Sequence, residues 1–404
     1  MNLFYVQKLL GRRFFTLLIT VALSIGWAAC GADNLAEKRR HYLENLPKNA
    51  PVKLAVIWSH LFGDFYYRGV QMAADEVNAA GGIAGHKVEP FLIDQYTNVK
   101  EGRDAVYPLS KDMDVAFALG LYKSEIAKPL TQLLQYYGLP ILINSNVTQI
   151  LQDQWSDGVF RGTVTTRDIG KAIYEECLSK RVDNVILCYS SESYPKSIAD
   201  PMMGLLRDNA RLNTQIYRVD ALTSEWHQKL KAATKDKDFR QQKTATVILM
   251  NVMTNISQFE KLLSALVEEG DIEMAFTSFI DIPVGKELSD RLGIPLFIIS
   301  DMLNTRSQAL ARRAGPDSFV SRFQKKNGRL PSGKTVYGYE QTMAVANAME
   351  KAGSIAPPRV IEAMHNTSYQ GVIQNYDYTD SGELKQPRYF KYTFRAGEMS
   401  ETLE

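Results

Sequence analysis

One segment of the chain has the residue types and the spacing that bind nucleotide phosphates. The run G-R-L-P-S-G-K-T at residues 328–335 fits the pattern G-x-x-x-x-G-K-[ST], in which backbone N–H groups and a lysine hold phosphate oxygens. That chemistry requires a buried strand before the loop and a helix after it. Here residues 318–327 are polar and helical in pattern, and Pro331 removes one N–H donor. We therefore expect a turn between two helices and no nucleotide site.

The other residue types that commonly catalyse reactions or bind metals are dispersed. The five histidines show no metal-ligand spacing, and the chain has neither a G-x-S-x-G elbow nor a C-x-x-C pair. Cys177 lies in a predicted helix and Cys188 in the next predicted strand, so two buried thiols and a disulfide are both compatible with the sequence. These absences favour a protein that is not an enzyme and that needs no metal or cofactor.

The composition is that of an ordinary globular chain. Of its 404 residues, 45% are hydrophobic and 23% are charged, and 47 Lys and Arg nearly balance 45 Asp and Glu. This length predicts two domains or one large one. The near-neutral charge excludes a strongly basic nucleic-acid binder, and the composition excludes wholesale disorder.

Residues 1–29 resemble an export signal. They contain Lys8, Arg12 and Arg13 but no acid, and an apolar run of at most 17 residues ends at Cys30. A helix that spans a bilayer needs about 20 apolar residues, so a cleavable signal peptide fits this run better. Because the total charge is +2, removal of these three basic residues leaves −1 on the exported chain.

A second feature of the N-terminus concerns Cys30. The run A-A-C-G at residues 28–31 resembles the end of a lipobox, whose cysteine is lipidated and becomes the first residue of the mature protein, although Trp27 stands where that motif prefers Leu. Simple secretion and an uncleaved anchor are the alternatives. Residues 30–51 are polar and end at Pro51, which predicts a tether between the lipid and the folded protein.

Beyond the tether, short apolar runs alternate with segments of helical periodicity. The runs predict strands at 52–58, 87–94, 115–120, 140–144, 184–189, 215–220, 245–251, 273–278 and 296–301. Such a βαβ series predicts an α/β fold with parallel sheets covered by helices on both faces, and the number of strands favours two lobes. The end of the chain differs, with a long helix at 336–353 and two extended segments, 371–379 and 388–395, joined by a turn.

The alternation of strands and helices also indicates where a ligand would bind. In open α/β sheets, ligands bind at the carboxyl ends of the strands. The loops expected to contact a ligand are therefore 58–66, 120–126, 144–149, 189–196, 251–256 and 278–285.

Two consecutive segments in the first predicted lobe carry a resemblance to a known family. The run F-G-D-F-Y-Y-R-G at 62–69, followed by A-A-D-E-V-N-A-A-G-G-I-A-G at 73–85, resembles the type I periplasmic binding proteins, and most closely the leucine/isoleucine/valine-binding family of ABC-transporter substrate receptors. The resemblance extends from about residue 52 to 396. Later elements follow in the same order: residues 139–145, 160–163, Tyr194, 337–341, 369–371, 380–382 and Pro387.

The resemblance implies a domain organisation. The family has two doubly wound parallel-sheet lobes joined by a hinge of three crossing segments, and a ligand is trapped between the lobes when the hinge closes. On this basis lobe 1 comprises residues 52–164 and 301–370, and lobe 2 comprises residues 165–300 and 371–404.

The resemblance also implies binding residues. Ser124 occupies the place of a family serine that begins a helix and holds the ligand carboxylate, and an N-terminal serine beside free N–H groups of Glu125 and Ile126 would bind an anion on physical grounds too. Asn146 and Thr148 correspond to a second carboxylate clamp. The candidate aromatic contacts, each of which could equally be ordinary packing, are Phe62, Tyr66, Tyr122 and Tyr194.

Two departures from the family pattern concern the second lobe. The loop that begins at Asn251 lacks the tyrosine that the family presents to its ligand, and Phe279 stands where the family has an acid that pairs with an α-ammonium group. Asp281 lies two residues further on and would replace this acid if the alignment slips. If Asp281 does not reach the cleft, a buried α-ammonium group would lack a counter-charge, which costs several kcal/mol.

The resemblance implies a function without covalent chemistry. A receptor of this family captures an amino acid or a related small solute outside the cytoplasmic membrane and passes it to the permease of an ABC importer, with no cofactor. Lobe closure desolvates the ligand, and the closed form is the one that a permease recognises. The alternative is a lipoprotein or receptor domain of the same fold whose degenerate cleft binds a protein partner and no transported solute.

Overall fold

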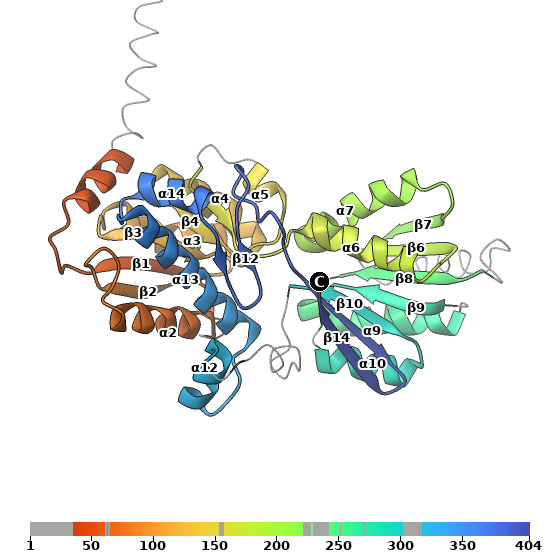
Figure 1. Cartoon of the computed structure of the whole chain (residues 1–404). Helices are drawn as coiled ribbons and strands as arrows, with labels where there is room; N and C mark the ends of the chain where they lie inside the picture. The colour runs from red at the N-terminus through yellow and green to blue at the C-terminus, as the bar shows by residue number, and fades with distance from the viewer. Residues whose placement is uncertain are drawn as a thin grey trace, which may run out of the picture.

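The computed structural model describes residues 35–60, 63, 65–152, 157–220, 228, 242–250, 252–269, 272–278, 280, 282–301, 315 and 317–404. These residues form two α/β lobes that lie side by side (Figure 1). Within this part of the chain, no helix combines the length and the hydrophobicity that crossing a bilayer requires.

Lobe 1 is built on a five-stranded parallel sheet with the order β2-β1-β3-β4-β5. Its strands are β1 (Val52–Trp58), β2 (Val88–Asp94), β3 (Val115–Gly120), β4 (Ile141–Ile143) and β5 (Val159–Arg161). The first four agree with the predicted strands to within a residue or two. The fifth was not predicted, because three residues are too few to show a periodicity.

Lobe 2 is built on a seven-stranded sheet with the order β14-β13-β10-β9-β8-β6-β7. Its five parallel strands are β6 (Asn184–Tyr189), β7 (Asn213–Arg218), β8 (Thr244–Leu249), β9 (Ile272–Thr277) and β10 (Leu296–Ser300). Two antiparallel strands, β13 (Phe390–Arg395) and β14 (Glu398–Leu403), complete the sheet at one edge.

Helices cover both sheets (Figure 1). They are α2 (Phe65–Ala79), α3 (Val99–Val106), the 3₁₀ helix η2 (Tyr107–Ser110), α4 (Ser124–Tyr136), α5 (Gln149–Gln152), α6 (Thr166–Ser179), α7 (Ser193–Asp208), α9 (Val252–Glu269), α10 (Ile282–Leu292), α12 (Phe319–Asn327), α13 (Gly333–Ala352) and α14 (Pro357–Asn366). The chain passes between the lobes after β5, after β10 and before β13. The predicted fold class, with two parallel-sheet lobes joined by three crossings, is thereby confirmed.

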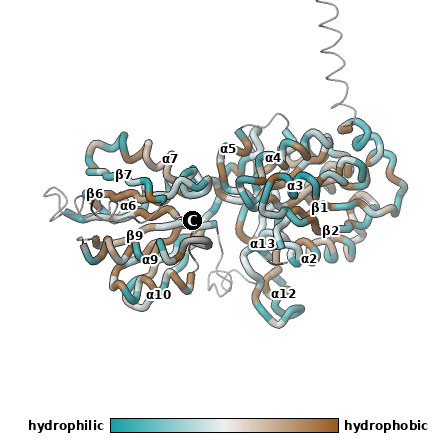
Figure 2. Tube along the Cα trace, turned by 180° about the vertical axis from the view of Figure 1, so that it is seen from behind, coloured by the Kyte–Doolittle hydropathy of each residue, from teal (hydrophilic) through white to brown (hydrophobic). Residues whose placement is uncertain are grey.

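The cores of the lobes follow from strands that are buried along their whole length. The central strands β3 and β8 are buried at every residue, as expected where helices cover both faces of a parallel sheet. Figure 2 shows hydrophobic and hydrophilic positions alternating along the helices of both lobes, as expected for helices that bury one face. The closest helix contact joins α2 to α13, where a Cβ on Gly338 would lie 2.0 Å from the carbonyl oxygen of Tyr66. This glycine therefore allows α13 to lie directly on α2.

The structure corrects the prediction of a tether over residues 30–51. Residues 35–44 are helical and pack against lobe 1, with Leu43 only 2% exposed. Arg39 is fully buried, and its guanidinium donates hydrogen bonds to the carbonyl oxygens of Leu109 (2.5 Å), Asp112 (2.8 Å), Val115 (2.8 Å) and Tyr137 (3.0 Å). The i, i+4, i+8 spacing of Leu35, Arg39 and Leu43 is the pattern that could have predicted this docked helix.

The carboxyl-terminal region contains more strands than the two predicted extended segments, 371–379 and 388–395. Residues 369–370 and 375–376 form the short hairpin β11 (Tyr369–Gln370) and β12 (Asn375–Tyr376), while β13 pairs with β10 and β14. The exposed edge of the long sheet provides backbone hydrogen-bond partners along the whole of β13. The two-residue strands β11 and β12 would provide far fewer.

The two cysteines of lobe 2 are free thiols. Cys188 lies on β6 with Ile186, on one face of the sheet, whereas Cys177 of α6 packs with Val185 and Leu187 on the other. A sheet therefore separates the two sulfur atoms, and a disulfide cannot join them in this fold. Burial raises the pKa of the Cys188 thiol to about 12, so this thiol is chemically inert in the folded protein.

Candidate functional site

The motif that resembles a phosphate loop connects two helices. Helix α12 ends at Gly328, which adopts a left-handed conformation, and α13 begins after its N-cap, Ser332. No strand leads into this segment, so the phosphate-binding geometry is missing and the predicted helix–helix turn is confirmed. In the part of the chain that the structure describes, no group of His, Cys, Asp and Glu could hold a metal ion.

A polar cluster forms where the carboxyl ends of the two sheets approach each other. We call it the interlobe cluster; its members are Tyr122, Ser124, Ser145, Asn146, Thr163, Tyr194, Asp301, Lys334 and Tyr337. Tyr122 and Ser124 follow β3, Ser145 and Asn146 follow β4, and Thr163 follows β5. Two others are Tyr194, at the start of α7 in lobe 2, and Asp301, which directly follows β10 where the chain crosses back to lobe 1. Lys334 and Tyr337 lie in the first turns of α13.

The loop after β3 is turned toward the cluster by Gly120. This residue has φ +117°, and a Cβ there would lie 2.1 Å from the carbonyl oxygen of Ile57. Only glycine adopts this conformation without strain. The backbone N–H of Tyr122 then donates to the buried Gln95 side chain at 2.9 Å, which fixes the loop at the end of the sheet.

Ser124 is the first residue of α4, and the N-cap is Lys123, which makes no side-chain capping hydrogen bond. The N–H groups of Ile126 and Ala127 both donate to the Lys123 carbonyl, so the described residues contain no acceptor for the N–H groups of Ser124 and Glu125. The donors available to an anion are thus one residue earlier than predicted. The Ser145 hydroxyl donates to the Ser124 hydroxyl at 3.0 Å and joins the β3 and β4 loops.

The side-chain amide of Asn146 joins the loop after β5 to the crossing segment that follows β10. Its Nδ2 atom is 2.8 Å from the Val164 carbonyl oxygen, 3.2 Å from Thr163 Oγ1 and 3.3 Å from Asp301 Oδ2. Thr163 Oγ1 also donates to Asp301 Oδ2, at 3.2 Å. Burial raises the pKa of the Asp301 carboxyl, while these hydrogen bonds from Asn146 and Thr163 act in the opposite direction.

Three tyrosines from three elements surround Asp301. The Tyr337 hydroxyl donates to the Asp301 carbonyl oxygen at 3.0 Å, and the Tyr194 hydroxyl is 3.0 Å from Ser278 Oγ. Burial, and secondarily the Asp301 charge, raises the pKa of Tyr122, Tyr194 and Tyr337. All three phenols therefore remain neutral and can donate hydrogen bonds at any physiological pH.

Lys334 brings a positive charge to the same cluster. Its ammonium lies 5.4 Å from the centre of the Tyr122 ring, a favourable cation–π distance. Burial lowers the pKa of this ammonium group, whereas the attraction of Asp301 raises it. The interlobe cluster thus contains one buried carboxylate and one half-buried ammonium group.

Arg161 holds the loop after β4 through hydrogen bonds to its backbone. This fully buried residue closes β5, and its guanidinium forms two hydrogen bonds to the Glu383 carboxylate, at 2.7 and 3.1 Å. It also donates to the carbonyl oxygens of Ser145 and Val147, the latter at 3.0 Å. Arg161 therefore ties the β4 loop to the carboxyl-terminal crossing segment.

Two candidate residues lie outside the cluster. Tyr66 is fully buried, its ring is stacked on Trp58 at 4.4 Å, and its hydroxyl donates to Gln341 at 2.6 Å, so it belongs to the packing of lobe 1. Thr148 bonds to Thr166 and lines a cavity of about 270 Å³ with Glu383, Asp168 and Thr163, of which Thr163 is also a member of the cluster. Phe62, Asn251, Asp281 and Cys30 lie outside the described residues.

Several members of the cluster were not among the candidates from sequence. Ser145, Thr163 and Tyr337 were noted only as parts of family motifs. Asp301 directly follows the apolar strand β10, so the rule applied to the other strand ends could have found it. Lys334 belongs to the phosphate-loop pattern that was set aside, and nothing in the sequence placed it opposite Asp301.

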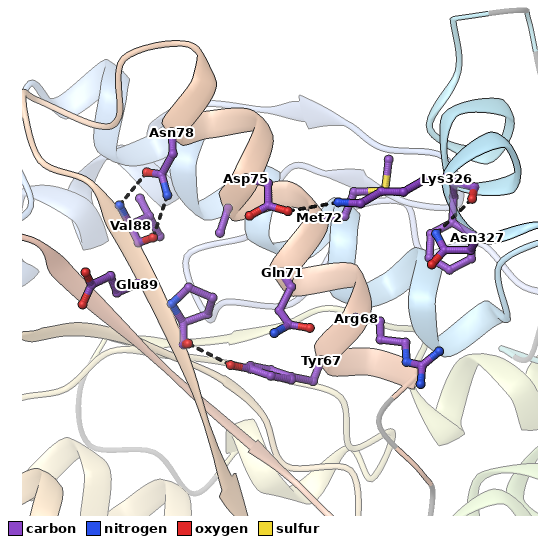
Figure 3. A pocket seen from close by; sticks show the side chains of 13 residues that line it. Tyr67, Arg68, Gln71, Met72, Asp75, Asn78, Val88, Glu89, Lys326 and Asn327 are labelled. Carbon is purple, nitrogen blue, oxygen red and sulfur yellow. Dashed lines mark hydrogen bonds and ion pairs between the residues drawn. The ribbon is translucent and has the colours of Figure 1, made fainter.

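A second cavity, of about 540 Å³, opens on lobe 1 between α2, β2 and α12 (Figure 3). Several of its polar groups are paired: Lys326 with Asp75 at 3.1 Å, Asn78 with both backbone groups of Val88, and the Tyr67 hydroxyl with the Pro90 carbonyl oxygen. This cavity borders the first residues of β2. It therefore lies at the amino-terminal edge of the sheet and is separate from the interlobe cluster.

Two parallel α/β lobes, three crossings and a polar cluster between the carboxyl ends of both sheets define a type I periplasmic binding protein. Residues 61–393 match the periplasmic binding protein family, and the chain belongs to that family. Its members are binding proteins and not enzymes, and they work outside the cytoplasmic membrane, so this protein is exported.

Curated relatives resemble the chain over most of its length. An "amino acid binding protein" of Pseudomonas aeruginosa is 24% identical over 341 residues, which cover 82% of this chain and 85% of the relative. A "leucine-, isoleucine-, valine-, threonine-, and alanine-binding protein" of the same organism is 22% identical over 331 residues and covers 80% and 83%.

Solved structures share the fold. An ABC transporter substrate-binding protein from Desulfitobacterium hafniense has a TM-score of 0.72 at 15% identity, covering 87% of this chain and 100% of that one. The branched-chain amino acid transporter substrate-binding protein LivJ from Streptococcus pneumoniae, in complex with isoleucine, has a TM-score of 0.64 at 18% identity, covering 88% and 99%.

Proposed function

We propose that the protein captures an amino acid or a related small solute between its two lobes and delivers it to the permease of an ABC importer. The observation that carries this proposal is the interlobe cluster, in which polar groups from three loops of lobe 1 lie with Tyr194 of lobe 2 and with Asp301, where the chain crosses back from β10 to lobe 1. Similarity to binding proteins named for amino acids supports the same ligand class. The division into lobe 1 (52–164 and 301–370) and lobe 2 (165–300 and 371–404) belongs to this proposal, extended by the docked helix at residues 35–44.

The ligand contacts follow from the geometry of the cluster. The Ser124 hydroxyl and the N–H groups of Ser124 and Glu125, at the positive end of α4, bind a carboxylate. Tyr122 and Tyr194 close on the ligand from opposite lobes. Asn146 orients Asp301, since its amide donates to that carboxylate.

A ligand screen tests this function. We expect at least one amino acid to raise the melting temperature of the purified protein by about 5 °C or more at 100 times its dissociation constant, because the ligand binds only the folded state. Differential scanning fluorimetry against amino acids, small amides and aromatic acids makes the measurement, with Ser124→Ala as the variant that should lose the effect. If no solute stabilises the protein, the alternative of a receptor for a protein partner replaces transport.

We further propose that Cys30 is lipidated and holds the exported protein at the membrane. In the wild type, the protein should sediment with membranes, and mass spectrometry should show an acylated cysteine at the first position. Cys30→Ser should lack the acyl group in the mass spectrum, because a serine accepts no thioether-linked lipid. Cys177→Ser is the matched control, since that thiol is buried. A wild-type protein without an acylated cysteine at its first position would contradict lipid anchoring.

A further inference from the structure

The helix at residues 35–44 is held against one edge of lobe 1. Its Arg39 guanidinium donates to the Val115 carbonyl oxygen at the start of β3 and to the Tyr137 carbonyl oxygen directly after α4. Since strands begin and helices end at the same edge of a parallel α/β sheet, the docked helix lies at the amino-terminal edge. The interlobe cluster follows the carboxyl ends of the strands and is at the opposite edge. Figure 1 shows the docked helix, in red-orange, on the side of lobe 1 that lies away from lobe 2.

Only a short stretch of chain separates this helix from the proposed lipid anchor. Cys30 precedes Leu35 by five residues, which span at most about 18 Å when fully extended. Leu35 itself packs against the core of lobe 1. Because even a small domain is roughly 30 Å across, this length is too short for lobe 1 to turn its opposite edge to the bilayer. The amino-terminal edge is therefore the one that faces the membrane.

Three exposed tyrosines surround the position at which Arg39 is bound. Tyr42, which is 43% exposed, lies three residues after Arg39 on the docked helix. Tyr107 (53% exposed) begins η2 and Tyr136 (42% exposed) ends α4, and residues next to both of these ends accept hydrogen bonds from Arg39. These are three of the eight large hydrophobic side chains that are exposed in the described part of the chain. Aromatic residues are thus concentrated at this edge, and we call the three together the tyrosine face.

Two exposed lysines accompany the tyrosine face. Lys38 is on the docked helix, and Lys111 places its ammonium 5.0 Å from the centre of the Tyr107 ring. Within the described residues, neither lysine forms an ion pair. Tyrosine rings are enriched at the headgroup level of bilayers, and lysines attract anionic headgroups. Because lysine is depleted at interfaces between proteins, this combination fits a lipid surface better than a protein partner.

We propose that the tyrosine face, with Lys38 and Lys111, lies on the surface of a phospholipid bilayer. This inference rests on the proposed anchoring at Cys30 and adds an orientation to it. Lobe 1 is held at the membrane, and lobe 2 is the part that moves when the hinge closes. Because the interlobe site is at the opposite edge of the lobe 1 sheet, it stays open to solute while the protein is on the membrane.

Fluorescent labels at the two edges of lobe 1 test this orientation. The exported, lipidated protein is placed in vesicles of phosphatidylethanolamine and phosphatidylglycerol. Tyr107→Cys carries a label on the tyrosine face. Tyr96→Cys is the matched control, because Tyr96 is a tyrosine of similar exposure (39%) that lies just beyond the carboxyl end of β2. Cys177 and Cys188 are buried and remain unlabelled.

Two measurements compare these labels. Energy transfer to acceptors in the bilayer should place the label at residue 107 about 20 Å nearer to the lipid than the label at residue 96, since a six-residue strand such as β3 separates the two edges. Nitroxide-labelled headgroups, which quench a fluorophore only at short range, should quench the label at residue 107 and leave the label at residue 96 unquenched.

A further pair of variants separates lipid contact from the effect of a short tether. In the Tyr107→Cys protein, Tyr42→Ser combined with Tyr136→Ser should remove most of the quenching. Leu178→Ser combined with Met399→Ser, two exposed hydrophobic residues of lobe 2, is the matched control and should leave the quenching unchanged. Melting curves verify that each variant folds. If the quenching persists without the two tyrosines, the tether alone holds lobe 1 and the proposed lipid contact is wrong.

The other outcomes distinguish the orientation from the anchoring. Equal distances for both labels, in protein whose Cys30 is shown to be acylated, would overturn the proposed orientation while the anchoring stands. Quenching in native membranes but not in lipid vesicles would assign the tyrosine face to a protein partner instead. Protein that carries no lipid and does not bind vesicles would overturn the anchoring and this orientation together, whereas amino acid capture depends on the ligand screen alone.

Discussion

Replacement of Arg161 by Met is expected to lower the free energy of unfolding by about 3–5 kcal/mol, the usual cost of removing one partner of a buried ion pair. Methionine retains the aliphatic part of the side chain but none of its donors. The Glu383 carboxylate, whose side chain is 22% exposed, then loses its partner, and the carbonyl oxygens of Ser145 and Val147 each lose the hydrogen bond from the guanidinium. Urea unfolding followed by circular dichroism provides the measurement.

The same substitution should also weaken ligand binding, because Arg161 holds the β4 loop that carries Ser145 and Asn146. Glu383→Gln is expected to cost less, about 1–2 kcal/mol, since the amide oxygen still accepts from Arg161. The double variant should be less destabilised than the sum of the two single ones, because the two side chains interact directly.

The control for Arg161 is the exposed pair of Arg359 and Glu362, at 3.4 Å, in which both side chains are more than 60% exposed. Arg359→Met should change the free energy of unfolding by less than about 0.5 kcal/mol, as for other surface pairs. A loss for Arg161→Met that is as small as this would show that Arg161 does not support the β4 loop energetically.

The second large effect concerns Glu340, which is fully buried on α13. Its carboxyl accepts hydrogen bonds from the Ile373 N–H at 2.7 Å and the Tyr376 hydroxyl at 2.8 Å. Burial raises the pKa of Glu340 to about 7, although these hydrogen bonds act to lower it. Between pH 4.5 and 7 the folded protein therefore retains a proton that the unfolded chain has released.

Stability should consequently fall as the pH rises. A raised carboxyl pKa contributes stability that is fully present below the unfolded value and is lost as the pH passes through the folded value. From pH 5 to pH 8 this one group should lower the free energy of unfolding by about 2–3 kcal/mol. In Glu340→Gln, which resembles the protonated side chain, this decrease should be absent.

The measurement is the difference in unfolding free energy between Glu340→Gln and the wild type at each pH, so that other titrating groups, including Asp301, cancel. The difference should grow in favour of the variant from pH 5 to pH 8. Glu350→Gln, at an exposed position of the same helix, should follow the wild type at every pH. If the difference in unfolding free energy does not change with pH, the pKa of Glu340 is the same in the folded and the unfolded protein, and the prediction is wrong.

Most of the fold could be predicted from local patterns. Apolar runs such as 52–58 and 115–120 are buried parallel strands because every side chain on them faces a covering helix. Local patterns did not predict elements that are very short or that are stabilised mainly by contacts with distant segments. Strand β5 has three residues, β14 exists through its pairing with β13, and the helix at 35–44 is held by the buried guanidinium of Arg39.

The sequence by itself determined the class of protein and several loops of the site, because the order of strands decides which loops share one edge of a sheet. The loops of Ser124, Asn146 and Tyr194 were located in this way, and the three residues themselves were proposed from the resemblance to the family. Only the tertiary structure decided that Tyr66 packs in the core, that Thr148 lines a cavity beside Glu383, and that Lys334 of α13 lies over the ring of Tyr122. Contacts of this kind arise from the crossing of the chain between lobes, and no local spacing encodes them.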